Sequence, residues 1–72
     1  MTFDWPKIVL NIRHSGLSYR AIERKVGMDK DNLGRYARGE LTGDPRFGQG
    51  LKLLDLHLAL CPDRHNLEAL RK

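Results

Sequence analysis

The chain has 72 residues, of which 40% are hydrophobic and 31% are charged, and it contains one cysteine. A chain of this length suits one small domain with a thin core, so we expect a binding surface on the outside rather than a deep catalytic cavity. A single cysteine excludes an internal disulfide framework and indicates a reducing, cytoplasmic compartment. No apolar run approaches the roughly 20 residues that cross a bilayer, so we expect no membrane partner.

The net charge of +4 is concentrated in the middle of the chain. Residues 15–39 contain six basic and three acidic side chains, which gives +3. Residues 1–14 carry +1, and residues 40–72 balance five acids against five bases. A polyanion would therefore meet the middle segment first. The alternative is an ordinary solvated helix face.

The first predicted helix begins after Asp4, which is a good N-cap residue. Pro6 stands in its first turn, where the missing N–H costs nothing. Apolar residues recur at a spacing of three and four, which predicts one buried face made of Trp5, Ile8, Val9 and Ile12. Gly16 follows the last turn and predicts the end of this helix.

Two short helices joined by a tight turn are predicted next. Ser18 is a good N-cap for the first, which ends at Gly27. Asp29 is a good N-cap for the second, which covers about residues 30–38 and ends at Gly39. Each start has a hydrophobic staple, in the pairs Leu17–Ile22 and Met28–Leu33. Because glycine adopts a positive φ without a Cβ clash, Gly27 suits the turn, and the pattern predicts a helix-turn-helix.

A longer helix is predicted to begin at Asp44-Pro45 and to end near Leu60, before Pro62. It has two opposed apolar stripes, one with Phe47, Leu51, Leu54 and Leu58 and the other with Leu53, Leu56 and Leu60. One stripe must face the core, and the other must be covered by a last short helix, capped by Asp63, or by a second copy of the chain. The expected dimer surface consists of Leu53, Leu56, Leu60, Leu67 and Leu70, with a monomer as the alternative.

These elements predict an all-α chain: a compact bundle of about five short helices that contains a helix-turn-helix, in one domain over residues 1–72. The segment from Leu17 to Gly39 resembles the helix-turn-helix core of the lambda-repressor and Cro family (Xre-type regulators). The two match in register at Leu17, Ser18, Ile22, Lys25, Val26, Gly27, Leu33, Arg35, Tyr36, Arg38 and Gly39. The similarity continues more loosely through Pro45 and the leucines of the longer helix.

Two positions depart from the family pattern. Glu23 stands where the family usually has a small residue at the crossing of the two helices, and Tyr19 stands where it often has a glutamine that touches DNA. Burying an unpaired carboxylate costs several kcal/mol. We therefore expect Glu23 to point outward or to pair with Arg20, Lys25 or Arg35.

The resemblance implies a sequence-specific transcriptional regulator that binds double-stranded DNA in the cytoplasm of a prokaryotic or phage-infected cell. In this family the second helix of the motif, about residues 30–38 here, enters the major groove. Side chains such as Arg, Asn and Asp can then bind guanine, adenine and the cytosine amino group, respectively. The predicted DNA contacts are Ser18, Tyr19, Arg20, Lys30, Asp31, Asn32, Gly34, Arg35 and Arg38, with Lys7 as a further backbone contact.

Catalytic and metal chemistry is weakly represented in the sequence. His57, Cys61 and His65 have the four-residue spacing of helical metal ligands, but Pro62 should break the helix between them. No phosphate loop or nucleophile–base set is present in the sequence, so we expect no enzyme activity and no cofactor.

An alternative function belongs to another class. In this alternative, the chain keeps the fold but binds protein instead of DNA, as an antirepressor-like or toxin-neutralising partner would. The carboxylates of Glu23 and Asp31 and the modest net charge favour this interpretation. The two functions differ in salt dependence, because phosphate contacts weaken steeply as salt rises.

Overall fold

Five α-helices and one 3₁₀ turn make up the computed structural model of the chain, which describes residues 3–41 and 43–71. The elements are α1 Trp5–His14, α2 Tyr19–Val26, α3 Asn32–Ala37, α4 Phe47–Leu60, the 3₁₀ turn η1 Pro62–Arg64, and α5 Leu67–Leu70. Within the described ranges the β-type pairing is limited to one antiparallel bridge between Phe3 and Arg71. The predicted all-α fold with about five helices is therefore confirmed.

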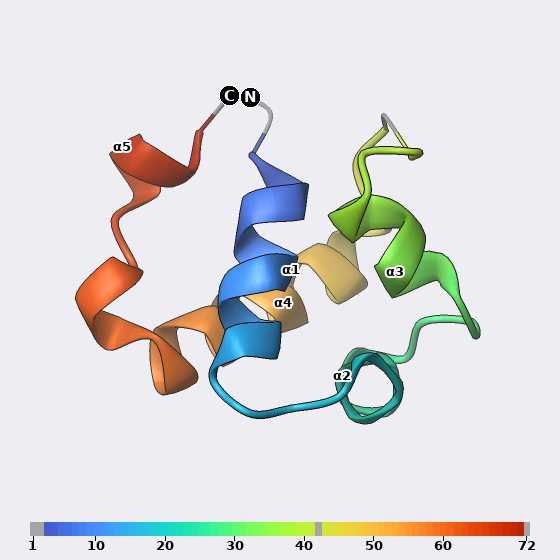
Figure 1. Cartoon of the computed structure of the whole chain (residues 1–72). Coiled ribbons are helices and arrows are strands. Elements are labelled where there is room, and N and C mark those ends of the chain that lie inside the picture. The colour runs from blue at the N-terminus through green and yellow to red at the C-terminus, as the bar shows by residue number, and fades with distance from the viewer. Residues whose placement is uncertain (1–2, 42, 72) are drawn as a thin grey trace.

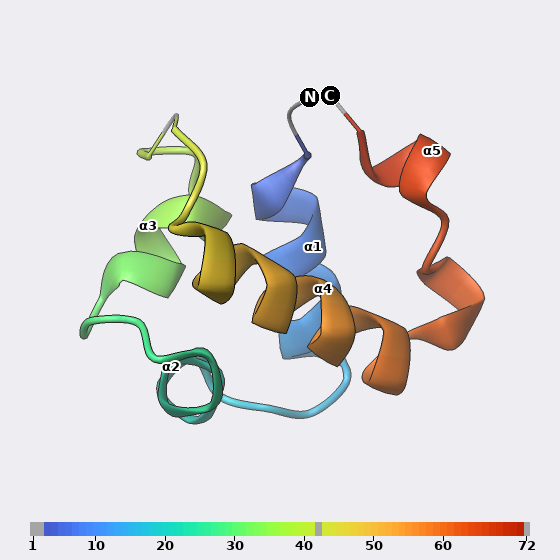
Figure 2. The ribbon, with the colours of Figure 1, turned by 180° about the vertical axis from the view of Figure 1, so that it is seen from behind.

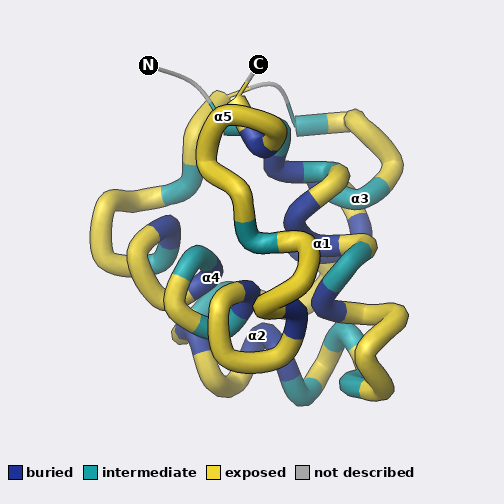
Figure 3. The backbone as a smooth tube through the Cα atoms, turned by 90° about the vertical axis from the view of Figure 1, so that its left-hand side faces the viewer, coloured by how far each residue is buried: buried dark blue, intermediate teal, exposed yellow. Residues whose placement is uncertain are grey.

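Helix α1 occupies the centre of the molecule and contacts α3, α4 and α5 (Figure 1). Its side chains Ile8, Val9 and Ile12 are completely buried, and Trp5 is nearly so, as the apolar spacing predicted. The core continues through Ile22, Val26, Leu33, Tyr36, Leu53 and Leu70. Figure 3 shows that buried positions follow the inner sides of the helices, while the outer turns are exposed.

The N-terminus of α1 is stabilised by Asp4 and by the end of the chain. The Asp4 side chain accepts a hydrogen bond from the Lys7 N–H at 3.4 Å, which confirms the predicted N-cap. The Asp4 N–H donates to the Leu70 carbonyl at 2.6 Å, and the buried Leu70 side chain completes the core there. Helix α5 contacts α1 and lies on the side of α1 opposite α3 (Figure 1).

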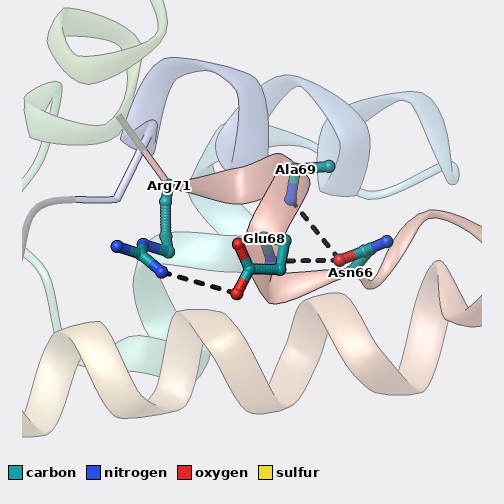
Figure 4. A network of polar contacts seen from close by, with 4 residues as sticks. All are labelled: Asn66, Glu68, Ala69 and Arg71. Carbon is teal, nitrogen blue, oxygen red and sulfur yellow. Dashed lines mark hydrogen bonds and ion pairs between the residues drawn. The ribbon is translucent and has the colours of Figure 1, made fainter.

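Helix α5 is short, and local hydrogen bonds fix its start and its end (Figure 4). The Asn66 side chain accepts from the backbone N–H groups of Glu68 and Ala69, and Arg71 pairs with Glu68 at 3.4 Å. The predicted cap, Asp63, lies instead in the 3₁₀ turn, because Pro62 starts a tight turn that ends before α5 begins.

Helix α3 begins two residues later than predicted. Its N-cap is Asp31, which has a positive φ of 70°, so Lys30 and Asp31 lie in the turn before the helix. The prediction that Asp29 caps this helix is wrong, because the Asp29 carbonyl accepts the Asn32 N–H at 3.3 Å and forms a turn there. Gly27 has the predicted positive φ of 76° and closes α2.

Helix α4 also begins two residues later than predicted, at Phe47. Asp44 does not cap it, because the Asp44 carboxylate accepts a hydrogen bond from the Trp5 indole N–H at 2.7 Å. The helix passes close to that ring: a Cβ placed on Gly50 would lie 3.2 Å from the Trp5 side chain. Gly50 therefore allows α4 to pack on α1 through the indole.

The structure decides which stripe of α4 faces the core. Leu53 is completely buried, whereas Phe47, Leu51 and Leu58 are 71%, 49% and 52% exposed. Leu53 and Leu70 therefore cannot form the predicted dimer surface, because both are in the core of the single chain. Of the other predicted dimer residues, Leu56 is half-buried, and Leu60 and Leu67 are 40% and 49% exposed.

A polar cluster joins the end of α4 to α1 and η1. His57 is completely buried; its Nε2 lies 3.0 Å from Asn11 Nδ2, and its Nδ1 lies 3.0 Å from His65 Nδ1. The Cys61 thiol donates to the Asn11 carbonyl at 3.3 Å. In the described part of the chain, no group of three or more His, Cys, Asp or Glu side chains is arranged to hold a metal ion. Among the same residues, no helix has the length and apolar character needed to cross a membrane.

Candidate nucleic-acid interface

A polar groove runs between α2 and α3. It encloses about 290 Å³ and is lined by Tyr19, Arg20, Glu23, Lys30, Asp31, Gly34 and Arg38. We call these residues the α2–α3 groove. Except for Glu23, all of them were predicted from the sequence as DNA contacts, and the fold brings them together although they belong to two helices and a turn.

Glu23 forms the floor of the groove. It is 6% exposed, and its Oε2 accepts a hydrogen bond from the Leu33 N–H at 3.2 Å. Leu33 is the second residue of α3, where backbone N–H groups have no partner within the helix. Glu23 therefore caps α3 from α2, and its negative charge lies at the positive end of the α3 dipole.

This capping corrects the expectation for Glu23. The side chain neither points outward nor pairs with a basic residue; its described partner is a backbone N–H. The cap is needed because, within the described residues, the Asp31 side chain makes no capping hydrogen bond to α3. The carboxylate at the helix crossing thus has a structural role, the capping of α3, which the small residue usual at this position could not fill.

Arg38 forms one wall of the groove and is engaged by an acidic neighbour. Its Nε donates to Glu40 Oε2 in an ion pair, with 61% and 49% of the two side chains exposed. The hydrogen bond and charge of this pair raise the pKa of Arg38 and lower the pKa of Glu40. Gly34 leaves space for the guanidinium, since a Cβ there would lie 3.2 Å from it. An anion that binds Arg38 must therefore compete with Glu40.

Tyr19 lies at the α2 end of the groove and is partly packed against the core. The Arg13 guanidinium lies over its ring, 5.8 Å from the centroid, which is within the range of a cation–π contact. Arg13 belongs to α1 and was not predicted as a contact residue. The sequence contains no signal for this contact, because Arg13 and Tyr19 lie in different helices and meet only when the turn between α1 and α2 places them together.

Four of the predicted contact residues lie outside the groove. Ser18 accepts the Ala21 N–H at 3.1 Å and so caps α2, as predicted. Asn32 lines a different hollow, on the side of α3 that faces the start of α4. Arg35 is exposed on the outer side of α3, and Lys7 is exposed on α1, away from the groove lining.

The charges of the groove are mixed. Arg20, Lys30 and Arg38 face the acidic Glu23 and Asp31. Glu23 is buried and its carboxylate accepts the Leu33 N–H, so the exposed charged side chains of the lining are Arg20, Lys30, Arg38 and Asp31. Arg13 adds a cation beside Tyr19 at the α2 end, and Arg35 is a further exposed cation on α3.

Comparison of the chain with protein-family models, curated proteins and solved structures gives no significant match. The function must therefore be argued from the residues of the chain and their geometry.

Proposed function

We propose that the chain binds double-stranded DNA through the α2–α3 groove and regulates transcription in a sequence-specific way. The observation that supports this most is the gathering of Arg20, Lys30 and Arg38 around one groove between the two helices of a helix-turn-helix. Arg35 adds a further exposed cation on α3. The resemblance to lambda-repressor and Cro proteins supports the same function and a prokaryotic or phage-infected cytoplasm.

Contacts with phosphates would come first from the long cationic side chains at the rim. Arg20 and Arg38 are suited to this, because guanidinium groups bind phosphate oxygens in a bidentate way. Such contacts fix the position of the protein on the duplex without reading its sequence. Arg38 would exchange its Glu40 carboxylate for a phosphate when DNA binds.

Base edges would be read from the start and the exposed side of α3. Lys30 and Asp31 lie in the turn directly before the helix, and Arg35 follows Asp31 by one turn. Arginine binds guanine through two acceptors, and a carboxylate accepts from the cytosine amino group. Asn32 is a weaker candidate than the sequence suggested, because it lines the hollow on the other side of α3.

The first experiment selects bound duplexes from a random pool and measures affinity for the selected site by fluorescence anisotropy. Affinity should fall steeply between low and moderate salt, because each phosphate contact releases counterions. Arg35→Ala should weaken binding to the selected site by about 1–3 kcal/mol and relax one base position. Lys52→Ala is the matched control, since Lys52 is an exposed cation on α4 outside the groove, and it should leave the selected sequence unchanged.

Protein binding is the second candidate function. Two acidic residues in the groove and the Arg38–Glu40 ion pair favour it, because they reduce the attraction for a polyanion. Weak binding to random duplex that does not change with salt, and a pool without enrichment, would favour this candidate over DNA binding. Either function is one of binding; we propose no catalysis and no cofactor.

A further inference from the structure

The outer side of α4 carries an apolar stripe that the α2–α3 groove does not use. It consists of Phe47, Leu51, Leu54 and Leu58, which we call the outer stripe. Phe47, Leu51 and Leu58 are 71%, 49% and 52% exposed, and Leu54 is half-buried. Single exposed leucines are ordinary, but an aligned apolar row along one 14-residue helix indicates an interaction surface. Figure 2 shows α4 crossing the near side of the molecule, with its full length accessible from that side.

The outer stripe borders a preformed apolar hollow of about 330 Å³. The hollow is lined by Phe3, Trp5, Asp44, Pro45, Phe47, Gly50, Leu51 and Leu54. Its floor is the Trp5 indole, which is held by the hydrogen bond to Asp44 and reaches α4 because Gly50 has no side chain. A fixed hollow beside a row of projecting side chains offers both the knobs and the hole of a helix contact.

The spacing of the outer stripe favours a second copy of the same helix. The intervals from Phe47 to Leu58 are four, three and four residues, so the row is the same when it is read from either end. In an antiparallel pair, Phe47 therefore meets Leu58 of the second copy, and Leu51 meets Leu54 of the second copy. The same arrangement places Leu54 of each copy at the hollow beside Gly50 of the other, which is the self-complementarity that a two-fold contact requires.

Charge complementarity favours the same orientation. Helix α4 begins at Phe47, and within the described residues its N-cap residue Arg46 makes no side-chain capping hydrogen bond, so an anionic side chain from outside would be stabilised by the positive end of the α4 dipole. Asp55 is exposed beside the outer stripe and forms no ion pair in the part of the chain that the structure describes. In the antiparallel pair, Asp55 of each copy lies beside the first turn of α4 in the other, near Gly48.

We propose that the outer stripe is the contact between two copies of this chain, packed with their α4 helices antiparallel. This contact replaces the leucine surface expected from the sequence, of which Leu53 and Leu70 are buried. The α2–α3 groove shares no residue with it. The proposal does not rest on DNA binding and can be tested without DNA.

The first test measures association of the wild-type chain by sedimentation equilibrium in the absence of DNA. Leu51→Glu places a carboxylate at the centre of the contact in both copies, and it should raise the dimer dissociation constant at least about 100-fold. Lys52→Glu is the matched control on the adjacent residue, outside the outer stripe, and should change the constant less than about threefold. Leu58→Glu is a second variant at an exposed position, and circular dichroism reports whether each variant keeps its helices.

Two results of this test would overturn the proposal. One is a wild-type chain that stays monomeric up to about 1 mM, where even weak complexes form. The other is a dimer that folded Leu51→Glu and Leu58→Glu leave intact. Because DNA affinity is measured separately, failure here and failure of the DNA-binding function are distinguishable.

The second test determines the orientation by disulfide cross-linking. In a Cys61→Ser background, one chain carries Phe47→Cys and another carries Leu58→Cys. Oxidation of the mixture should give mixed dimers in at least about tenfold excess over the dimers that either chain forms alone. Efficient cross-linking of the Phe47→Cys chain with itself would indicate parallel helices and overturn the antiparallel pairing, as would the absence of any cross-link from a dimeric mixture.

Discussion

Helices α3 and α4 are displaced from their predicted starts by the same number of residues, but their N-termini are stabilised differently. Both helices begin two residues late, at Asn32 and Phe47. At α3, a carboxylate from another helix, Glu23, supplies the missing cap. At α4, the expected cap Asp44 is bound to the Trp5 indole, and the helix begins at an exposed turn.

This difference shows what decides whether a carboxylate just before a helix caps that helix or binds another donor. In the first turn of α3 the Leu33 residue is buried against α2, so its N–H cannot bind water and requires a partner within the protein. The start of α4 is exposed, so water can satisfy its N–H groups and Asp44 is free to bind a buried donor. Which N–H donor a carboxylate binds therefore depends on which donors are buried, and not on which helix start is nearest along the chain.

The largest expected effect is at the buried cap. Glu23→Ala should lower the free energy of unfolding by about 2–3 kcal/mol, because it removes the cap and leaves the buried Leu33 N–H unpaired. Glu23→Gln keeps an acceptor and should lose less than half as much. Urea unfolding measures both. Asp29→Ala is the control at the cap predicted from the sequence and should change stability by less than about 0.5 kcal/mol; an equal loss in Asp29→Ala and Glu23→Ala would contradict the assignment.

A smaller loss of stability is expected at Asp44, which binds the Trp5 indole and does not cap α4. Asp44→Ala should cost about 1–2 kcal/mol, because the Trp5 indole N–H loses its acceptor, while Asp44→Asn should be milder. Urea unfolding followed by Trp5 fluorescence measures the change. Since Asp44 does not cap α4, the far-ultraviolet circular dichroism of the folded Asp44→Ala variant should match that of the wild type. A loss of helical signal would mean that Asp44 supports α4 directly.

At the other end of α4, the buried His57 should make the stability of the fold depend on pH. Burial lowers the pKa of His57, and the nearby His65 and Arg64 lower it further. The unfolded chain therefore takes up a proton at a higher pH than the folded chain, and stability falls as the pH decreases below about 6.5. Urea midpoints at about pH 7 and pH 5 measure this loss. His57→Gln should reduce the difference between the two midpoints; an unchanged difference would assign the pH dependence to other groups.

The smallest expected effect concerns the rim of the groove and depends on the proposed DNA binding. Glu40→Ala frees Arg38 from its ion pair and should tighten binding to duplex DNA about two- to fivefold at low salt. Fluorescence anisotropy at several salt concentrations measures it. Glu68→Ala, which breaks the exposed pair with Arg71 on α5, is the matched control and should leave the affinity unchanged. Equal affinities for Glu40→Ala and wild type would show that Glu40 does not compete with phosphate.

Local signals in the sequence were sufficient where one turn of chain contains all the partners. The spacing of Ile8, Val9 and Ile12 determined the buried face of α1, and Ser18 determined the start of α2. Gly27 and Gly39 have the positive φ expected where short helices end. Pro62 ended α4 at Leu60 as predicted, because it cannot continue the helix.

The candidate site could be predicted in part for the same reason. The helix-turn-helix pattern identified most of the residues that line the groove, since they repeat at helical spacing on two neighbouring helices. It could not identify Arg13 or the role of Glu23, because their contacts join separate elements. It also gave Asn32 as a DNA contact together with the groove residues, whereas Asn32 lines a different hollow.

The sequence by itself thus determined the helices of this protein, the buried face of α1 and the basic middle segment. The tertiary structure alone decided where α3 and α4 begin, which stripe of α4 is buried, and which carboxylate caps which helix. The hydrogen bonds that decide these points join residues 10 positions apart for Glu23 and Leu33 and 39 positions apart for Trp5 and Asp44. Such bonds form only after packing has excluded water from the donors, and a pattern within one turn of chain carries no record of that competition.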